Sequence, residues 1–304
     1  PIIGSYKDYK IVSMGPPSSG GALLINMLNM LEYYSSDSLE WNSSDYAHIM
    51  TEIQRRAYSD RAEHMGDPDY WKVPLNMFKS KKYAKNRISD IRMDQSTPSK
   101  AVYAGSPNGY ESPETTHYSV VDQWGNAVSV TTTINLSYGN GCVVEGAGFF
   151  LNNEMDDFSA KPGIPNAFGL IGNEANSIAP KKRPLSSMTP TIVLKDNKPF
   201  LVVGSPGGST IITTTMQTIL NVVDYEMDIK EAVCASRFHS QWLPDVIQIE
   251  PRGLTKDVLV NLKSRGHEII YRGGYIGESN GIMITDEGFF GGGDCRGETS
   301  ALGY

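Results

Sequence analysis

The sequence predicts an α+β layered sandwich, because helical and strand patterns are mixed along the chain. Three observations support this fold class: helical periodicity fills the front of the chain, strand pairs begin after residue 115, and helices recur between those pairs. The length of 304 residues allows one large domain or two small ones with a substantial hydrophobic core.

The front segment, 1–114, is expected to be mostly helical. A Gly-rich turn opens its first helical pattern, in which Met27 and Met30 recur on an apolar face and belong to the core. The second pattern starts with good N-cap residues and ends near Gly66. The predicted front elements are helical patterns at 16–37 and 43–67, a helical or irregular stretch at 68–100, and a turn-rich linker at 101–114.

The back segment, 115–304, is expected to be rich in sheet. Runs of β-branched and aromatic residues are bounded there by turn-forming residues, and helical patterns separate them. The predicted strand pairs are 116–122 with 127–136, 191–195 with 199–204, and 268–271 with 281–285 and 288–291. The predicted helices are 209–223, 228–235 and 255–265.

The first of these hairpins has one polar face. Along 127–136, alternate side chains are small and polar on one face and mostly apolar on the other. The turn leaves two registers open: a three-residue loop centred on Trp124 sets Thr115 opposite Thr133, and a two-residue loop sets Thr116 there. Only the first register brings the two hydroxyls of interest together.

Thr115 at the head of a strand has a chemical use. If the bond after Glu114 is cut, Thr115 carries a free α-amine with a pKa of ~7.7–8.0, which takes up a proton at neutral pH. A threonine hydroxyl is a poor nucleophile by itself, and its own α-amine can activate it. Threonine pairs also open many ordinary strands, so composition alone favours a structural role.

Charge and composition argue against several classes of function. The net charge of −7 makes nucleic acid an unexpected partner, and no apolar run is long enough for a membrane span. The three cysteines, Cys142, Cys234 and Cys295, are far apart and outside any CxxC pair, so neither a disulfide framework nor a zinc site is expected. No metal and no cofactor are expected. No signal peptide is visible, but the chain opens on Pro1, which suggests an excised piece.

Six segments together carry a more specific signal. They are "ETTHYSVVD" (114–122), "FFLNNEMDDFSAKPG" (149–163), "KRPLSSMTPTIV" (182–193), "GSPGGSTIITT" (204–214), "RFHSQWLPD" (237–245) and "DCRGETSALGY" (294–304). In this order and spacing, the chain closely resembles bacterial γ-glutamyltransferase, also called γ-glutamyltranspeptidase, over essentially its whole length. "PPSSGG" (16–21) and "YSDR" (58–61) extend the resemblance into the front segment.

The resemblance implies the four-layer αββα sandwich of N-terminal nucleophile hydrolases, N-terminally truncated in this chain. It implies a precursor that cuts itself between Glu114 and Thr115, so that 1–114 is the C-terminal part of a large subunit and 115–304 is the small catalytic subunit. The Thr115 hydroxyl then attacks the γ-amide of glutathione or another γ-glutamyl donor. The γ-glutamyl ester passes to water or to an amino-acid or peptide acceptor. A periplasmic or secreted location is implied by the resemblance alone.

The resemblance also implies roles for other residues. Thr133 hydrogen-bonds the nucleophile, which agrees with the register centred on Trp124. Oxygen acceptors hold the donor's α-ammonium group, hydroxyls hold its α-carboxylate, and glycine N–H groups form an oxyanion hole. These residues are Asn135, Glu154 and Asp157 for the ammonium group, Ser186 and Ser187 for the carboxylate, and Gly207 and Gly208 for the oxyanion hole. His117 and His239 are expected to be structural.

Taken alone, each of these signals has a plainer interpretation. The acidic run "EMDD" also suits a solvated turn or a cation site, the serine pair suits a loop, and the glycine pair suits a structural turn. A phosphate-binding loop is excluded, because no Lys follows the glycines.

Three departures from the family pattern are expected to matter. The family's donor-binding arginine lies upstream of the matched residues, many bacterial members have Tyr near the position of Phe168, and all 304 residues form one chain. While uncleaved, Thr115 has an amide nitrogen and turnover should fail. Two alternatives therefore stay open. One is a related amidase acting on poly-γ-glutamate or on β-lactam side chains, and the other is an inactive, unprocessed fragment that lacks the N-terminal part of the large subunit.

Overall fold

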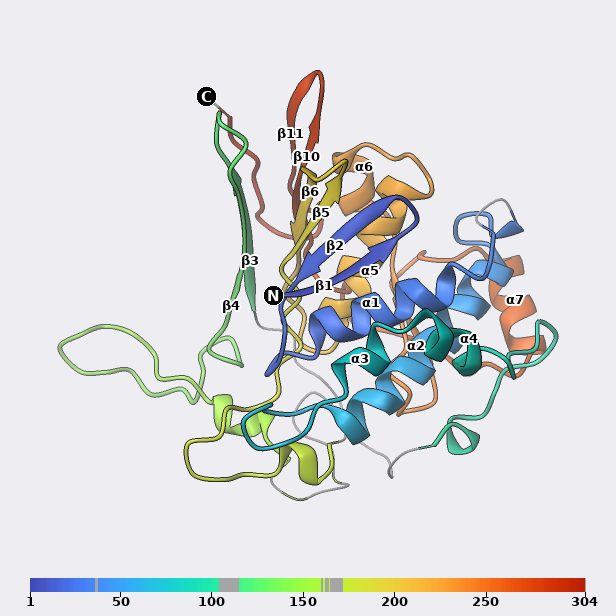
Figure 1. Cartoon of the computed structure of the whole chain (residues 1–304), viewed down its shortest axis with the longest axis horizontal. Helices are drawn as coiled ribbons and strands as arrows, with labels where there is room; N and C mark the ends of the chain where they lie inside the picture. Colours follow the sequence, from blue (N-terminus) through green and yellow to red (C-terminus); the bar gives the residue numbers. More distant parts are fainter. Residues whose placement is uncertain (36–37, 104–114, 160, 162–163, 165–171, 304) are drawn as a thin grey trace.

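The computed structural model of the chain describes residues 1–35, 38–103, 115–159, 161, 164 and 172–303. Its helices and strands form the predicted α+β class, arranged in layers (Figure 1). A helical layer covers one face of a central six-stranded sheet. A hairpin of β3 (Thr116–Val121) and β4 (Ala127–Thr132) lies against the other face. None of the described helices is long and apolar enough to cross a membrane.

The central sheet joins strands from both predicted segments of the chain. Its strands are β1 (Ile2–Tyr6), β2 (Tyr9–Ser13), β5 (Thr191–Lys195), β6 (Lys198–Gly204), β10 (Asn280–Thr285) and β11 (Gly288–Gly292), in the order β1-β2-β5-β6-β10-β11. All neighbouring pairs are antiparallel. No strand before β3 is predicted from the sequence, because β1 and β2 are short and a turn at Lys7 with φ +49° separates them. The division into 1–114 and 115–304 stays a prediction about cleavage.

The helical layer is built around α1 (Gly20–Leu31), all of whose residues are buried. The other helices are α2 (Ser44–His64), α3 (Leu75–Phe78), α4 (Lys81–Arg87), α5 (Thr210–Val223), α6 (Ile229–Cys234) and α7 (Lys256–Ser264). A helix buried on all sides belongs in the middle of a layer, and α1 packs against α2, α4, α5 and β1. α2 begins after Ser43, whose hydroxyl accepts from Tyr46 N at 3.1 Å.

The hairpin adopts the first of the two predicted registers. Thr116 pairs with Thr132, the loop is centred on Trp124, and the glycine after it has φ +83°. Continued by one residue, this pairing sets Thr115 opposite Thr133. The polar ends of the two strands therefore meet at the open end of the hairpin.

A small third sheet shows that one predicted strand pairing is wrong. Its order is β7-β8-β9, with β7 (Phe238–His239), β8 (Ile247–Ile249) and β9 (Ile269–Tyr271). The segment 268–271 does not pair with 281–285, because β9 pairs in parallel with β8, and β10 pairs with β6 and β11. The helix α7 connects β8 to β9, and two parallel strands need such a crossover connection.

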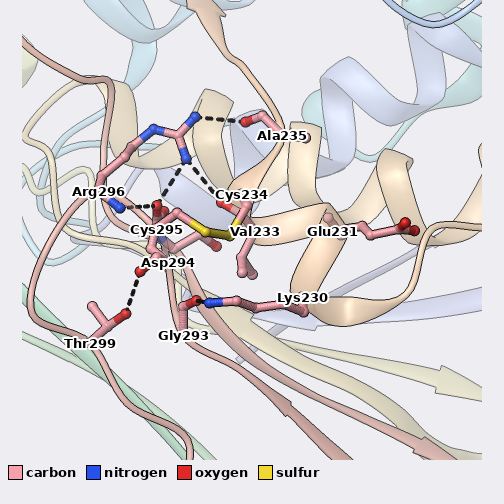
Figure 2. The surroundings of a disulfide bond; sticks show 12 residues. Lys230, Glu231, Val233, Cys234, Ala235, Gly293, Asp294, Cys295, Arg296 and Thr299 are labelled. Carbon is pink, nitrogen blue, oxygen red and sulfur yellow. Dashed lines mark hydrogen bonds and ion pairs between the residues drawn. A yellow bond between two sulfur atoms is a disulfide. The ribbon is translucent and has the colours of Figure 1, made fainter.

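A disulfide between Cys234 and Cys295 shows that the expectation drawn from the cysteines is wrong. Cys234 ends α6, and Cys295 follows it by 61 residues, with the two Cα atoms 5.2 Å apart (Figure 2). The expectation used spacing alone, whereas the fold brings the C-terminal segment back onto α6. Beside the disulfide, Arg296 Nη2 donates to Ala235 O at 2.7 Å (Figure 2). Cys142 is free and exposed.

His117 joins the hairpin to the central sheet. Its ring is buried, with Nδ1 2.9 Å from Thr131 Oγ1 and Nε2 3.1 Å from Ser119 Oγ. The ring lies directly on Gly204 at the end of β6. Burial lowers the pKa of His117 to about 4, so the ring is neutral at physiological pH. These contacts support the structural role predicted for His117.

We predict that Gly204→Ala destabilises the protein by about 1–3 kcal/mol, because a filled interior has no room for another carbon. An added Cβ would lie 2.9 Å from His117 Nε2 and closer still to Cε1 and Nδ1. Denaturant unfolding measures the change. Gly273→Ala is the matched control, since a Cβ there meets no atom within 4 Å. The penalty should shrink in a His117→Ala background, and an equal penalty in both backgrounds would contradict the contact.

We also predict that replacing Cys234 and Cys295 together by Ser lowers the free energy of unfolding by about 4 kcal/mol. The disulfide closes a loop with a sequence separation of 61, and its loss returns that loop entropy to the unfolded chain. Urea unfolding measures the difference, with Cys142→Ser as the control for loss of a thiol. A double variant as stable as the wild type would refute the predicted contribution.

Candidate active site

A pocket in the described structure is lined by segments far apart in the sequence. They are the C-terminal part of α2, the open end of the hairpin, the short 3-10 helix Glu154–Asp157, the loop before β5, and the start of α5. The lining residues are Arg61, Thr115, Thr133, Asn135, Asp157, Leu185, Ser186, Ser187, Met188, Gly208 and Ile211.

Seven of the nine residues to which the sequence assigns a catalytic or binding role line this pocket. The other two, Glu154 and Gly207, are neighbours of the lining residues Asp157 and Gly208. Glu114, on the other side of the predicted cleavage site, lies outside the described residues, as does Phe168. The fold therefore gathers the predicted residues in one place, and their individual roles stay predictions.

Two threonine hydroxyls belong to the open end of the hairpin. Thr115 directly precedes β3 and Thr133 directly follows β4, so the antiparallel register sets them opposite each other. Thr133 Oγ1 accepts from Asn135 N at 2.8 Å. Asn135 has φ +74°, which ends the extended strand conformation at this point. The backbone thus fixes the Thr133 hydroxyl next to the position of Thr115.

One group of lining residues offers hydrogen-bond acceptors. The Asn135 amide nitrogen donates to Asn153 O at 3.0 Å, while the buried Oδ1 of Asn135 has no hydrogen-bond partner within the described part of the chain. An unpaired buried oxygen costs free energy unless a ligand satisfies it. Asp157 adds a carboxyl group, which shares a hydrogen bond with Glu154. We call Asn135, Glu154 and Asp157 the acceptor group.

Simultaneous ionisation of the two carboxyl groups of the acceptor group, Glu154 and Asp157, is unfavourable. Burial, and after it the charge of Glu154, raise the pKa of Asp157 to about 8, although the charge of Arg61 acts in the opposite direction. Burial also raises the pKa of Glu154. At neutral pH the acceptor group therefore holds a proton, which a bound cation would displace.

A second group of lining residues offers donors. Ser186 Oγ accepts from Met188 N at 3.0 Å, and Ser187 Oγ accepts from Arg61 Nη2 at 3.1 Å. Since each oxygen accepts from a protein donor, each hydroxyl hydrogen is left to donate to an anion. The backbone of Ser186 is held by the loop before α1, where Ser19 N donates to Ser186 O at 2.9 Å. We call Ser186 and Ser187 the donor group.

A glycine turn connects β6 to α5, as the sequence predicts. Gly207 and Gly208 have φ +133° and +58°, conformations that favour glycine. β6 ends at Gly204 and α5 begins at Thr210. Backbone N–H groups at a helix N-terminus have no partner within the helix and stabilise negative charge. The turn therefore suits an oxyanion beside the Thr115 hydroxyl.

Arg61 is a pocket residue for which the sequence predicts no role. It lies on α2, is 4% exposed, and donates from Nε to Ser19 Oγ at 2.9 Å as well as from Nη2 to Ser187. The motif "YSDR" at 58–61 contains it. α2 also carries two arginines that pair with a glutamate of the same helix, so the sequence pattern could not show which arginine reaches the pocket.

The predicted structural histidine His239 lies outside the pocket lining. Its Nδ1 is 2.8 Å from Thr213 Oγ1 and its Nε2 is 2.9 Å from Gln241 Oε1. Burial lowers the pKa of His239 to about 3, so the ring is neutral. These contacts support a structural role within the helical layer.

A buried cluster of His48, Glu52 and His267 places possible metal-ligand atoms close together. His48 Nδ1 lies 2.7 Å from His267 Nε2, so the rings are hydrogen-bonded to each other. The Glu52 carboxylate already accepts from Arg55 and Arg56, and these two cations disfavour a metal ion. We interpret the cluster as a structural hydrogen-bond network, and the expectation of no metal stays a prediction.

We predict that Asp157→Asn stabilises the empty protein relative to the wild type as pH rises from 5 to 9. The folded-state pKa of Asp157 is raised to about 8, so the folded protein holds a proton that the unfolded chain has already released. The wild type therefore loses stability between the unfolded and folded pKa values, and asparagine does not. Thermal unfolding across this pH range measures the difference. Asp8→Asn, at an exposed position outside the pocket lining, is the control, and a pH-independent difference for Asp157→Asn would contradict the prediction.

The whole chain is similar to proteins of known families. A family model described as gamma-glutamyltranspeptidase matches residues 1–304. "Glutathione hydrolase proenzyme" from Escherichia coli strain K12 is 47% identical over 297 residues, which cover 97% of this chain and 51% of that protein. "Acylase ACY 1 proenzyme" from Pseudomonas sp. strain SE83 is 36% identical over 295 residues, which cover 97% of this chain and 50% of that protein. The chain thus spans about half the length of the curated relatives it matches.

Solved structures show the same similarity. A mutant of Helicobacter pylori gamma-glutamyltranspeptidase is 59% identical with a TM-score of 0.58, over 60% of this chain and 100% of that chain. Cephalosporin acylase from Bacillus halodurans has a TM-score of 0.82 over 100% of this chain and 53% of that chain. Its identity is 23%, so this second likeness concerns the fold alone.

Proposed function

Because the chain belongs to the gamma-glutamyltranspeptidase family, we propose that its parent protein is a self-processing γ-glutamyltransferase and glutathione hydrolase. Glutathione and other γ-glutamyl compounds are the proposed donors. Water, amino acids and peptides are the proposed acceptors. No cofactor or metal takes part in the proposed reaction.

One observation carries the proposal: the pocket combines the Thr115 hydroxyl with both an acceptor group and a donor group. A γ-glutamyl donor has an α-ammonium group, an α-carboxylate and a γ-amide. Asn135 and Asp157 suit the ammonium group, because ammonium hydrogens need oxygen acceptors. Ser186 and Ser187 suit the carboxylate, because their hydroxyls donate. A donor held at both charged groups presents its γ-carbonyl carbon to Thr115.

Self-processing is the proposed first reaction. The Thr115 hydroxyl attacks the carbonyl carbon of Glu114, and its proton passes to the Thr115 nitrogen as the peptide C–N bond breaks. An ester between Glu114 and Thr115 Oγ and a free Thr115 α-amine result. Water then hydrolyses this ester. Glu114 is left with a free carboxylate, and Thr115 regains its hydroxyl and keeps the α-amine with a pKa of ~7.7–8.0, suited to a general base.

In turnover, the Thr115 α-amine takes the hydroxyl proton while Oγ attacks the γ-carbonyl carbon of the donor. Thr133 orients the attacking hydroxyl by a hydrogen bond. The N–H groups of Gly207 and Gly208 stabilise the oxyanion, and losing one such donor typically costs ~10²–10³ in rate. The α-amine then gives its proton to the leaving amine, and a γ-glutamyl ester remains on Thr115. Water or an acceptor amine attacks the ester and restores the hydroxyl.

A related amidase is the second candidate, since the acylase relative is 36% identical over 97% of this chain. The unpaired Asn135 Oδ1 and the protonated carboxyl pair favour a ligand with a cationic group. The interior of poly-γ-glutamate and many β-lactam side chains lack an ammonium group at this place. We therefore favour donors with a free α-amino group.

We also propose that other parts of the parent protein cover the outer face of the hairpin. Figure 1 shows β3 and β4 at one side of the molecule, beyond the central sheet. On this hairpin Val120 pairs directly with Val128, and both side chains are about half exposed, as is Tyr118. An apolar sheet face is normally covered by another layer, and the αββα fold has helices at that place. Sequence outside this chain, corresponding to the other half of the relatives, is the proposed source.

Export to the periplasm or secretion is the proposed location, from the family resemblance. The disulfide between Cys234 and Cys295 supports it, because disulfides persist in oxidising compartments. Fractionation of the producing cells tests the location, and recovery of the protein in the reducing cytoplasm would contradict it.

We predict that the full-length parent protein yields two polypeptides, the smaller one starting at Thr115, and that Thr115→Ala stays in one piece. Intact-mass analysis and N-terminal sequencing measure both outcomes. Thr116→Ala is the matched control and should be cleaved normally, because the register sets Thr115 and not Thr116 opposite Thr133. Cleavage of Thr115→Ala at the same bond would show that the Thr115 hydroxyl is not the nucleophile. A processed wild type that cleaves an acylase substrate but not a γ-glutamyl anilide would favour the second candidate.

A further inference from the structure

We propose that Arg61 makes the pocket selective for donors that carry an α-carboxylate, by fixing the Ser187 hydroxyl and by placing a positive charge behind it. The inference rests on the proposed function and deepens it. Arg61 acts through Ser187 and is therefore a positioning residue.

Two hydroxyls hold the Arg61 side chain in one orientation. Nε donates to Ser19 Oγ at 2.9 Å and Nη2 donates to Ser187 Oγ at 3.1 Å. The guanidinium plane fixes the angle between these two donors, which a lysine could not reproduce. Ser19 Oγ in turn donates to Ser186 O at 2.8 Å. One buried arginine on α2 therefore connects to both serines of the donor group.

This arrangement decides how the Ser187 hydroxyl is used. An arginine N–H can only donate, so Ser187 Oγ accepts from it and keeps its own hydrogen for another acceptor. Ser187 is 9% exposed and lines the pocket, where a ligand oxygen can take that hydrogen. A hydroxyl that is already oriented does not lose rotational freedom when the carboxylate binds.

The charge of Arg61 acts in the same direction. Asp157 and Glu154 belong to the same site, and the negative charge that they share disfavours binding of the donor's α-carboxylate. Arg61 opposes that charge, as its lowering effect on the pKa of Asp157 shows. Charges interact more strongly in a buried site than in water. A pocket with this arginine accepts the ammonium group and the carboxylate of one amino acid together.

Ser186 does not share this direct support, because its Oγ accepts from the backbone N–H of Met188. A change at Arg61 therefore removes the orientation of one of the two hydroxyls and leaves the other. We expect a graded loss of carboxylate recognition and not the loss of all binding.

The test uses the full-length, self-processed parent protein with hydrolysis of L-γ-glutamyl-p-nitroanilide as the reporter. Inhibition constants are measured for L-glutamate and for 4-aminobutanoate, which is glutamate without its α-carboxylate. We expect Arg61→Gln to raise the inhibition constant of L-glutamate about 10- to 100-fold, which is the range for a lost charged hydrogen bond. The inhibition constant of 4-aminobutanoate should rise less than about threefold. Arg61→Lys keeps the charge without the two-point contact, so its inhibition constant for L-glutamate should lie between those of the wild type and Arg61→Gln.

Arg87→Gln is the matched control. Arg87 also bonds to α2, at Asp60, but it does not line the pocket, so both inhibition constants should stay unchanged. Arg61→Gln that weakens both inhibitors equally, or neither, would overturn the inference. The inference also fails if both Arg61 variants are insoluble or unprocessed while Arg87→Gln behaves normally, because the role is then structural.

The failure of the proposed function gives a different result. A processed wild type that does not hydrolyse the anilide contradicts that function and leaves the role of Arg61 measurable. Calorimetric titration of wild type and Arg61→Gln with L-glutamate and 4-aminobutanoate then measures both affinities. The role of Arg61 is supported if the substitution weakens L-glutamate binding far more than 4-aminobutanoate binding.

Discussion

The antiparallel register of the β3–β4 hairpin is the constraint on which the site depends. A slip of one residue would turn every side chain of a strand to the opposite face, and Thr115 would no longer lie opposite Thr133. The loop centred on Trp124 fixes this register locally. The contact of His117 with Gly204 fixes it against the central sheet, because only one face of the hairpin fits there.

The pocket contains unpaired polar and ionisable groups whose burial destabilises the fold and which a purely structural interior would exclude. Asn135 has an unpaired buried oxygen, and burial raises the pKa of the carboxyl groups of both Asp157 and Glu154, which share a hydrogen bond. Arg61 is almost fully buried beside them. Such local costs concentrate where a ligand can relieve them. Here a ligand with both an ammonium group and a carboxylate would satisfy the acceptor group and the donor group at once.

The C-terminal segment supports the glycine turn from outside the pocket. Asp294 accepts from Ser279 N at 2.6 Å, and two residues before Ser279 the chain passes beside the turn, with Gly277 close to Gly207. Cys295, which follows Asp294, is covalently bonded to Cys234 at the end of α6 through the disulfide (Figure 2). A covalent and hydrogen-bonded path thus runs from the end of the chain to the turn that the proposed oxyanion would use.

The sequence by itself determined what is local. Helical and strand periodicity and the position of the hairpin turn follow from neighbours in the chain. The roles of Thr115, of the acceptor group and of the donor group were implied by the resemblance of six segments to a family, and the residues alone left two hairpin registers open. The tertiary structure alone decided which distant segments meet. Spacing could not pair Cys234 with Cys295 or β9 with β8, and it could not select Arg61 from the arginines of α2. These contacts depend on how the layers pack, since residues far apart in sequence become neighbours only when their elements are placed in space.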